Sequence, residues 1–149
     1  MKKFLLILML NLLFVATAAA QGVVSVKSNY GVATTANRLE KALQEKDITV
    51  FARIDHADGA RSVGQTLKPT ILVIFGTPAM GTPLIERSRT MGIDLPMKAL
   101  IWEDKAGKVW FSYNDPDYLF RRHGLTEMNA AMHTLQQTLA GLAAAATQP

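Results

Sequence analysis

The stretch that most constrains the fold is residues 67–83, LKPTILVIFGTPAMGTP. Within residues 71–75 both alternating sets of side chains are apolar, so a strand here has no face suited to water. The pattern therefore predicts a central strand that is covered on both faces. Two glycines and two prolines within residues 76–83 then end this strand, because proline cannot donate to a ladder and glycine reaches backbone angles closed to other residues.

The first 20 residues have the three-part pattern of a secretory signal peptide. Two lysines form a positive start, residues 4–16 form an apolar run, and three alanines follow at residues 18–20. This pattern predicts cleavage between Ala20 and Gln21, and a single periplasmic or secreted domain over residues 21–149. A retained membrane anchor is the alternative, but the apolar run is shorter than the roughly 20 residues that span a bilayer. After cleavage we expect no membrane association.

The composition of the predicted mature chain narrows the classes of function. Two of the 16 Lys and Arg lie in the leader, which leaves 14 basic against 12 acidic residues and a net charge of +2. The basic residues are scattered, so no stripe can follow a phosphate backbone, and we expect no nucleic-acid binding. The chain has no cysteine, which excludes disulfides, a thiol nucleophile and a thiolate metal site.

The remaining elements follow from periodicity. Residues 21–27 alternate as a short strand, and residues 31–46 have the period of an amphipathic helix. Residues 48–55 alternate again, which predicts a strand with one buried face made of the even-numbered residues. Residues 83–91 predict a short helix, and residues 99–103 and 108–113 predict a hairpin around a turn that contains Gly107.

The last element is the clearest helix. Its apolar stripe runs from Met128 to Leu142, and residues 143–146 are expected to fray at its end. The resulting order is strand, helix, four strands with a minor helix among them, and a final helix. Hairpin-linked strands with two long helices predict an α+β domain whose antiparallel sheet has its helices on one face.

A series of ordered motifs resembles the family catalogued as domain of unknown function 302, over about residues 22–133. These motifs are Ile54-Asp55-His56 with Ala60-Arg61, Pro69, Phe75-Gly76-x-Pro78 with Gly81-Thr82-Pro83-Leu84, Ile93-Asp94-Leu95-Pro96-x-Lys98, Trp102-Glu103-Asp104, Gly107-Lys108-Val109, Tyr113-Asn114-Asp115-Pro116 and Arg122-His123-Gly124-Leu125.

The resemblance implies a β-α-β-β-β-β-α fold similar to one repeat of the TATA-binding-protein-like architecture. It does not imply DNA binding, because a shared fold is not a shared site, and the family brings no established reaction. Two positions depart from the family pattern. Thr77 replaces an expected Asn, which puts any role of that amide in doubt, and Asp47 replaces a helix-ending Gly.

The most reactive cluster in the sequence is Asp55-His56-x-Asp58, because a carboxylate beside an imidazole can raise its basicity for general base work. Adjacent residues of a strand point to opposite faces, however, so Asp55 and His56 cannot share a hydrogen bond if the strand continues. A polar loop in which His56 holds the turn explains the same residues. An enzyme with His56 as base, oriented by Asp55 or Asp115, remains the alternative.

Neither a metal nor a cofactor is expected. His56, His123 and His133 have none of the short spacings of zinc sites. The methionines have the spacing of buried residues, so we interpret them as core residues and not as copper ligands. Residues 76–81 match the glycine spacing of a phosphate loop but lack its lysine, and Pro78 removes one backbone donor.

The leading hypothesis is a non-catalytic domain that binds a small molecule or a partner subunit, because polar, glycine-rich loops after strong strands commonly carry function. We expect the turn of residues 75–81 and the loop of residues 56–61 to share the mouth of the site, with Arg61 and Tyr113 near the turn by family motif alone. The candidate ligand-binding residues are Asp55, His56, Arg61, Phe75, Gly76, Thr77, Gly81 and Tyr113. A third hypothesis is a homodimer formed through the stripe of the final helix.

Overall fold

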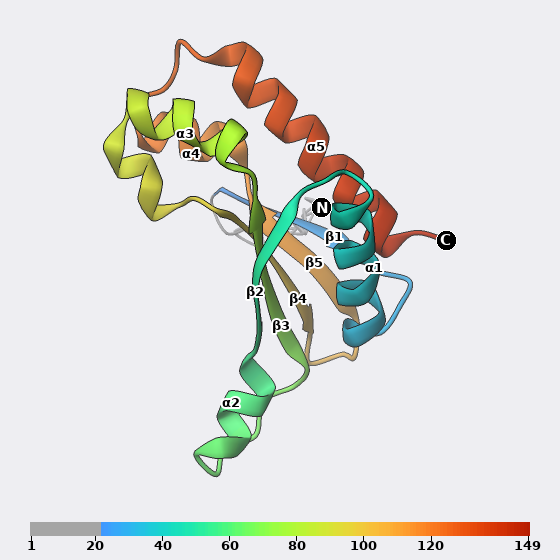
Figure 1. Ribbon diagram of the computed structural model, residues 1–149. Helices are drawn as coiled ribbons and strands as arrows, with labels where there is room; N and C mark the ends of the chain where they lie inside the picture. The colour runs from blue at the N-terminus through green and yellow to red at the C-terminus, as the bar shows by residue number, and fades with distance from the viewer. Residues whose placement is uncertain (1–21) are drawn as a thin grey trace, which may run out of the picture.

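The computed structural model describes residues 22–149, so the predicted signal peptide and its cleavage site at Ala20 and Gln21 lie outside the described residues. The elements follow one another along the chain as Figure 1 shows. They are β1 (Val23–Lys27), α1 (Val32–Gln44), β2 (Thr49–Asp55), α2 (His56–Ser62), β3 (Thr70–Gly76), α3 (Pro78–Arg87), the 3-10 helix η1 (Arg89–Ile93), β4 (Met97–Glu103), β5 (Val109–Asn114), α4 (Pro116–Arg122) and α5 (Asn129–Thr147).

The five strands form one antiparallel sheet in the order β1-β5-β4-β3-β2. The predicted α+β fold and its order of strands and long helices are confirmed. The hairpin of β4 and β5 turns through Gly107, whose φ of 78° is favourable for glycine. In this turn Asp104 accepts hydrogen bonds from two backbone N–H groups and from the Trp110 indole, which hold the hairpin closed.

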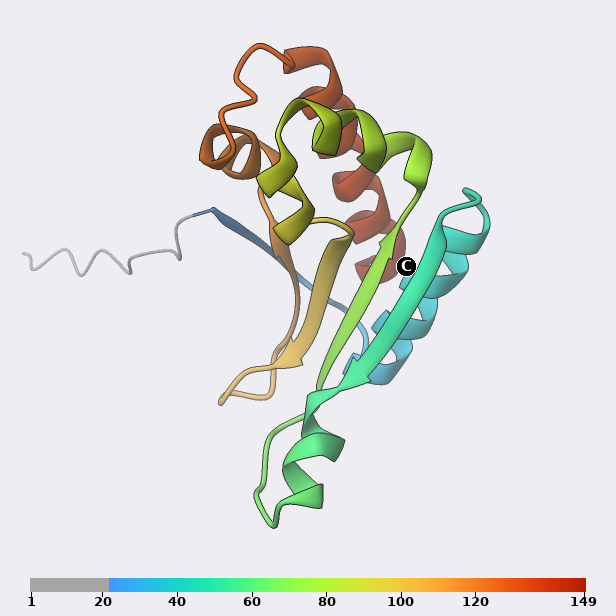
Figure 2. The same cartoon turned by 60° about the vertical axis from the view of Figure 1, so that its left-hand side comes forward.

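Strand β3 is central, but helices cover only one of its faces. Ile71, Val73 and Phe75 are buried against the helices, whereas Leu72 and Ile74 are half-buried on the other face. Helices α1 and α5 lie on the same side of the sheet (Figures 1 and 2). The prediction of a strand covered on both faces was therefore wrong, because both faces are apolar but, among the described elements, only one is packed by helices.

The open face of the sheet carries an apolar patch made of Ile54, Ile74, Leu72, Leu100, Trp102 and Trp110, and register places Lys27, Lys98 and Ser112 on the same face. Register places Leu72 directly between Ile54 and Leu100, and Trp102 directly opposite Trp110, so these side chains share one face. The Trp102 indole N–H donates to Ser112 Oγ at 2.9 Å. This pairing satisfies the polar atom of Trp102 within the patch.

Strand β2 forms one edge of the sheet, and its predicted single buried face was wrong. A bulge between Val50 and Ala52 shifts the register, so Val50 pairs with Phe75 on the helix side while Ile54 pairs with Leu72 on the open face. Ala52 is the only residue of β2 that is not exposed. The even-numbered residues are thus divided between the two faces, because the bulge breaks the alternation on which the prediction rested.

Helices α1 and α5 pack against each other on the covered face. The α5 stripe buries Leu135, Leu139 and Leu142, and Ala143 and Ala146 are buried as well. The expectation that residues 143–146 fray was wrong, since the helix continues to Thr147.

Arg38 of α1 holds the C-terminal end of α5. Its guanidinium donates to the carbonyl oxygens of Ala145, Ala146 and Gln148 at 2.9, 3.3 and 2.6 Å. Cations are favourable at this end of a helix, where the last carbonyls lack helical partners. The guanidinium also stacks on the Tyr30 ring, 4.4 Å from its centroid.

The helices outside the covered face lie at the two ends of the sheet. Helix α2 projects beyond one end of β2 and β3, and α3 and α4 lie at the other end (Figures 1 and 2). The antiparallel register of β2 and β3 explains this division, because Asp55 pairs with Ile71 while Thr49 pairs with Gly76. Residues after β2 and residues after β3 therefore leave the sheet in opposite directions.

Candidate functional site: an apolar cavity at the end of β3

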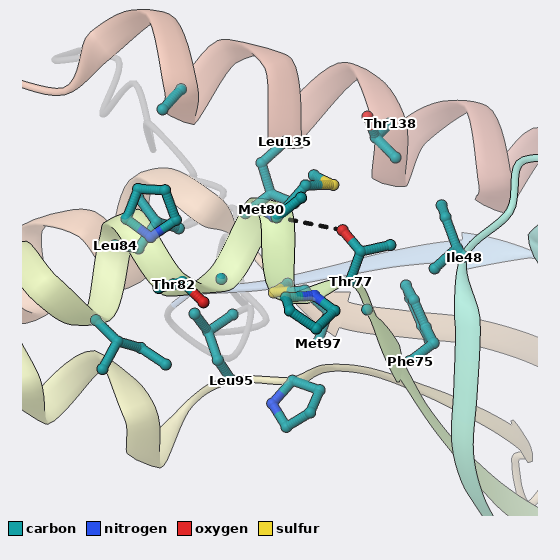
Figure 3. A pocket seen from close by; sticks show the side chains of 18 of the residues that line it. Ile48, Phe75, Thr77, Met80, Thr82, Leu84, Leu95, Met97, Leu135 and Thr138 are labelled. Carbon is teal, nitrogen blue, oxygen red and sulfur yellow. Dashed lines mark hydrogen bonds between the residues drawn. The ribbon is translucent and has the colours of Figure 1, made fainter.

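A cavity of about 410 Å³ lies where β3 ends, between α3, the start of β4 and α5. Its volume is within the range of roughly 300 to 1,000 Å³ that is typical of small-molecule sites. Figure 3 shows its walls from close by. The lining residues are Ile48, Phe51, residues 75–85, Leu95, Pro96, Met97, Met128, Ala131, Thr134, Leu135, Thr138 and Leu139.

The turn after β3 forms one wall, and its sequence explains its shape. Thr77 is the N-cap of α3 in extended backbone, and its Oγ1 accepts a hydrogen bond from the Met80 N–H at 3.3 Å. Pro78 occupies the first helical position, where its missing N–H is not needed. A side chain at Gly76 would come within 3.6 Å of Pro96, which faces it from the lead into β4. The chain therefore turns from strand to helix within two residues.

Helix α5 forms the opposite wall through the first half of its stripe. Ala131, Thr134, Leu135, Thr138 and Leu139 recur at three and four residues, so they share one helical face. The second half of the same stripe packs against α1. Part of the predicted dimer stripe thus faces its own chain and part lines a cavity, and the homodimer predicted from the stripe stays a prediction.

The chemistry of the walls is uniform. None of the described residues that line the cavity carries an ionisable side chain, and four threonines supply its side-chain hydroxyls. Met80, Met97 and Met128 bring flexible thioethers from three different segments, which adapt to irregular apolar shapes. An arrangement of this kind accepts an uncharged, mostly apolar molecule, because burying an unpaired charge here would be costly.

Four of the predicted ligand-binding residues lie together at this cavity. Phe75, Gly76, Thr77 and Gly81 all line it. Sequence reasoning missed the contributions of α5, of Phe51 and of Leu95 to Met97. The stripe of α5 was visible but had the pattern of packing, and Leu95 and Pro96 were visible as a family motif without a spatial position.

The other predicted loop lies elsewhere. Asp55, His56 and Arg61 belong to α2 or its N-cap, at the end of the sheet away from the cavity. The expectation that residues 56–61 and 75–81 share one mouth was wrong, because antiparallel pairing of β2 and β3 separates the two segments by the length of the strands. Arg61 instead pairs with Asp58 at 2.7 Å on an exposed surface.

The arrangement needed for general base catalysis by His56 is not formed. Asp55 Oδ1 caps α2 by accepting the Asp58 N–H at 3.0 Å, and none of the side-chain hydrogen bonds among the described residues involves His56. Asp115 caps α4 at the opposite end of the sheet. Neither carboxylate is placed to orient His56, because each is committed to a helix start.

Tyr113 is buried on β5 and is not among the cavity-lining residues. Its ring packs edge-on against Phe111 with the centroids 6.0 Å apart. Burial raises the pKa of its phenol above the ordinary value, and the nearby Asp115 carboxylate raises it further. Tyr113 is separated from β3 by β4, since its partner Ala99 pairs with Val73 in the middle of β3, so the prediction that Tyr113 lies near the turn of residues 75–81 is not confirmed.

A second polar cluster was not anticipated. His123 Nε2 lies 2.6 Å from Asp94 Oδ2, its Nδ1 lies 2.9 Å from Thr90 Oγ1, and Arg122 Nη1 lies 3.4 Å from the same Asp94 oxygen. The His123 and Asp94 side chains are only 4% and 11% exposed. A histidine between a carboxylate and a hydroxyl is an arrangement able to transfer protons. Here it joins α4 to the segment that precedes Leu95.

Asp94 and His123 both belong to motifs quoted for the family resemblance, which are Ile93 to Lys98 and Arg122 to Leu125. That resemblance was the one signal that could have suggested their contact. Among the described residues, no three His, Cys, Asp or Glu side chains group as a metal site. Within the same part of the chain, no helix is both long and apolar enough to cross a membrane.

Comparison with known proteins places the chain in a family. The family described as "Domain of unknown function DUF302" matches residues 24–146. The chain is similar to an uncharacterised conserved DUF302 protein from Bacillus stearothermophilus, with a TM-score of 0.72 and 18% identity over 85% of this chain and 99% of that one. That likeness shows the fold.

Curated relatives are longer proteins. The chain is 46% identical over 110 residues to proteins named "Fluoride-specific ion channel FluC 1" from Brucella suis and from Brucella abortus. The match covers 74% of this chain but only 43% and 41% of those proteins. The chain thus spans less than half the length of the curated relatives it matches.

Proposed function

The chain belongs to the DUF302 family, and from the cavity at the end of β3 we propose that it binds a small, uncharged and mostly apolar molecule. The observation that carries the proposal is a cavity of about 410 Å³ whose described lining residues include no ionisable side chain. Apolar pockets with a few polar groups are the usual form of small-molecule sites.

The packing around the cavity supports a binding site and not a defect in the core. Native cores are close-packed and contain few voids larger than a water molecule. Met80 is 39% exposed and Phe51 is 53% exposed at the rim, although both are large and apolar. A bound apolar molecule would cover such side chains and contribute the free energy of removing apolar surface from water.

The matched Brucella proteins are named as fluoride-specific ion channels, but this chain spans less than half of their length. The proposal therefore rests on the residues of this chain alone. Export to the periplasm remains a prediction from the leader. An enzymatic role for His56 is not proposed, because its two candidate carboxylates cap helices instead.

The test compares two probes of similar shape, 2-isopropenylnaphthalene and 2-naphthoate, by titration calorimetry or competition with a fluorescent probe. We expect the hydrocarbon to bind and the carboxylate to bind at least about ten-fold more weakly, because its charge would be buried without a partner. Equal binding of both, or binding of neither, would contradict the proposal.

A pair of variants on α5 localises the binding. Ala131 lines the cavity, whereas its neighbour Ala130 is exposed and does not. Ala131→Trp fills the cavity and is expected to weaken hydrocarbon binding by about ten-fold or more. Ala130→Trp adds the same side chain outside the cavity and is expected to leave the affinity unchanged.

A second candidate function, self-association, is favoured by the open face of the sheet. Strand spacing of about 4.8 Å and a rise of about 3.4 Å per residue make this face roughly 20 by 20 Å. Two copies packed face to face would bury roughly 800 Å² in projection, and more once side-chain relief is counted, which approaches the roughly 1,000 Å² of a biological interface.

Leu100 lies in the middle of this face, paired with Leu72 on one side and Ser112 on the other. We expect the protein to sediment as a dimer at micromolar concentration, and Leu100→Lys to sediment as a monomer. Ala33→Lys, an exposed change on α1, serves as the control and should remain a dimer. A monomeric wild-type protein would exclude this function.

A further inference from the structure

The cavity contains four hydroxyl groups, and they are not equivalent. Thr134 and Thr138 lie on α5, Thr77 caps α3, and Thr82 lies within α3 on an exposed position. Each hydroxyl has one proton to donate and two lone pairs to accept with. Which of them can recognise a ligand therefore depends on how its proton is already used.

The two hydroxyls of α5 are committed to their own helix. Thr134 Oγ1 donates to the Ala130 carbonyl at 3.0 Å, and Thr138 Oγ1 donates to the Thr134 carbonyl at 2.9 Å. This back-bonding to the preceding turn is a common state of threonine in helices. These residues consequently have no proton free for a ligand unless a helical bond is broken.

Thr77 is in the opposite state. Its Oγ1 accepts the Met80 N–H, and among the described residues its own proton enters no hydrogen bond. The capping bond holds the oxygen in place at the end of α3, and Thr77 is half-buried. In Figure 3 Thr77 extends from the end of β3 on the wall across from Thr138 of α5. Thr82 is likewise in no side-chain hydrogen bond among the described residues, but it is exposed, so Thr77 is the half-buried hydroxyl of the cavity whose proton is free.

We propose that the Thr77 hydroxyl donates a hydrogen bond to an acceptor oxygen of the ligand, which makes the ligand an uncharged, otherwise apolar carbonyl compound such as a ketone, ester or lactone. This inference rests on the proposed function, because it concerns the same cavity. A donor left unpaired beside a bound hydrocarbon loses its hydration, so a matching acceptor is favoured. A carboxylate would satisfy Thr77 but would bury a charge that no lining residue neutralises.

The experiment measures the affinity ratio of two probes that differ in one group. In 2-acetylnaphthalene a carbonyl oxygen takes the place of the terminal CH₂ of 2-isopropenylnaphthalene, so size and shape are matched. We expect wild-type protein to bind the ketone about five-fold more tightly than the alkene, as one neutral hydrogen bond provides. Thr77→Val should reduce the ratio to about one by weakening ketone binding alone.

Three further variants separate recognition from capping. Thr77→Ser keeps the donor and should keep the ratio. Thr77→Asp keeps an N-cap acceptor but has no proton to donate at neutral pH, so it should fold and lose the preference for the ketone even if Thr77→Val is too unstable to measure. Thr82→Val removes a hydroxyl at the rim and should leave the ratio unchanged.

The outcomes distinguish this inference from the function on which it rests. If wild-type protein binds both probes equally, or if Thr77→Asp retains the five-fold preference, the inference is wrong while cavity binding stands. If neither probe binds, the proposed function fails as well. A loss of preference in Thr82→Val with none in Thr77→Val would assign the donor to Thr82 and overturn the role of Thr77.

Discussion

His123 Nε2 lies 2.6 Å from Asp94 Oδ2, and this contact ties the end of α4 to the segment that leads into the cavity wall. Asp94 immediately precedes Leu95 and Pro96, which line the cavity. Both side chains are nearly inaccessible to solvent, so each satisfies a polar group that burial would otherwise leave unpaired. The pair therefore determines where the cavity wall lies relative to α4.

We expect Asp94→Asn or His123→Leu to lower the free energy of unfolding by about 2 kcal/mol, the typical cost of leaving one buried polar partner unsatisfied. Urea denaturation at neutral pH measures this change. The matched control is Glu45→Gln, which removes an exposed partner of Lys41 at 3.9 Å and should cost less than about 0.5 kcal/mol. Equal effects at the two sites would show that the buried pair contributes nothing special.

Asp47 has a φ of 55°, a left-handed conformation that favours glycine, and it stands where the family resemblance leads us to expect a helix-ending Gly. Asp47→Gly should therefore raise the free energy of unfolding, by about 0.5 kcal/mol after the greater entropy of unfolded glycine is counted. Asp47→Ala should lower it by a similar amount, because alanine keeps the strain and loses the local polar side chain. Thermal unfolding of the three proteins checks the order, and a glycine variant less stable than the alanine variant would contradict it.

Arg38 should determine whether the end of α5 stays helical. Replacing it with Ala removes the donor to three carbonyl oxygens, and we expect a loss of about 1 kcal/mol together with faster amide hydrogen exchange in residues 143–148. Lys41→Ala, a change on the exposed side of α1, is the control. Unchanged exchange at the end of α5 in the Arg38 variant would show that packing alone holds this turn.

The Asp104 carboxylate predicts a loss of stability in acid. The hydrogen bond from the Trp110 indole lowers the pKa of Asp104, and backbone N–H groups of Lys108 and Ala106 lower it further. As pH falls, Asp104 takes up a proton near pH 4 in the unfolded chain but only at a lower pH in the folded chain. The ionised carboxylate therefore stabilises the fold fully above about pH 4, and this stabilisation is lost as pH falls through the lower folded pKa.

Unfolding of wild-type protein and Asp104→Asn across this acid range is the measurement. The stability advantage of the wild type should be constant above about pH 4 and should shrink below it. An advantage that does not change with pH would contradict this assignment of the carboxylate.

The leader predicts a defined N-terminus. If residues 1–20 are removed, protein recovered from the periplasm begins at Gln21, which intact mass spectrometry measures directly. Ala18→Arg places a large charged side chain at a cleavage-reading position and should cause the uncleaved precursor to accumulate, whereas Thr17→Ser should be processed normally. A mature protein that still contains Lys2 would exclude cleavage.

How far the sequence predicted the site depended on distance along the chain. Phe75, Gly76, Thr77 and Gly81 were identified because strand, turn and cap signals lie within seven consecutive residues. The opposite wall, from Ala131 to Leu139, comes from a helix that begins 48 residues after Gly81, and its pattern is the same whether the helix packs on a core or lines a cavity. His123 and Asp94 were missed for the same reason, since no local pattern expresses a contact between separate segments.

By itself the sequence determined the class of fold, the order of strands and long helices, and the turn that ends β3, because periodicity, proline, glycine and capping residues act within a few positions of themselves. Tertiary structure alone decided that one apolar face of β3 has no described helix on it, that β2 is a bulged edge, and that the two polar loops lie at opposite ends of the sheet. These outcomes depend on which strands pair and in which direction, and pairing is set by the free energy of the whole packed core.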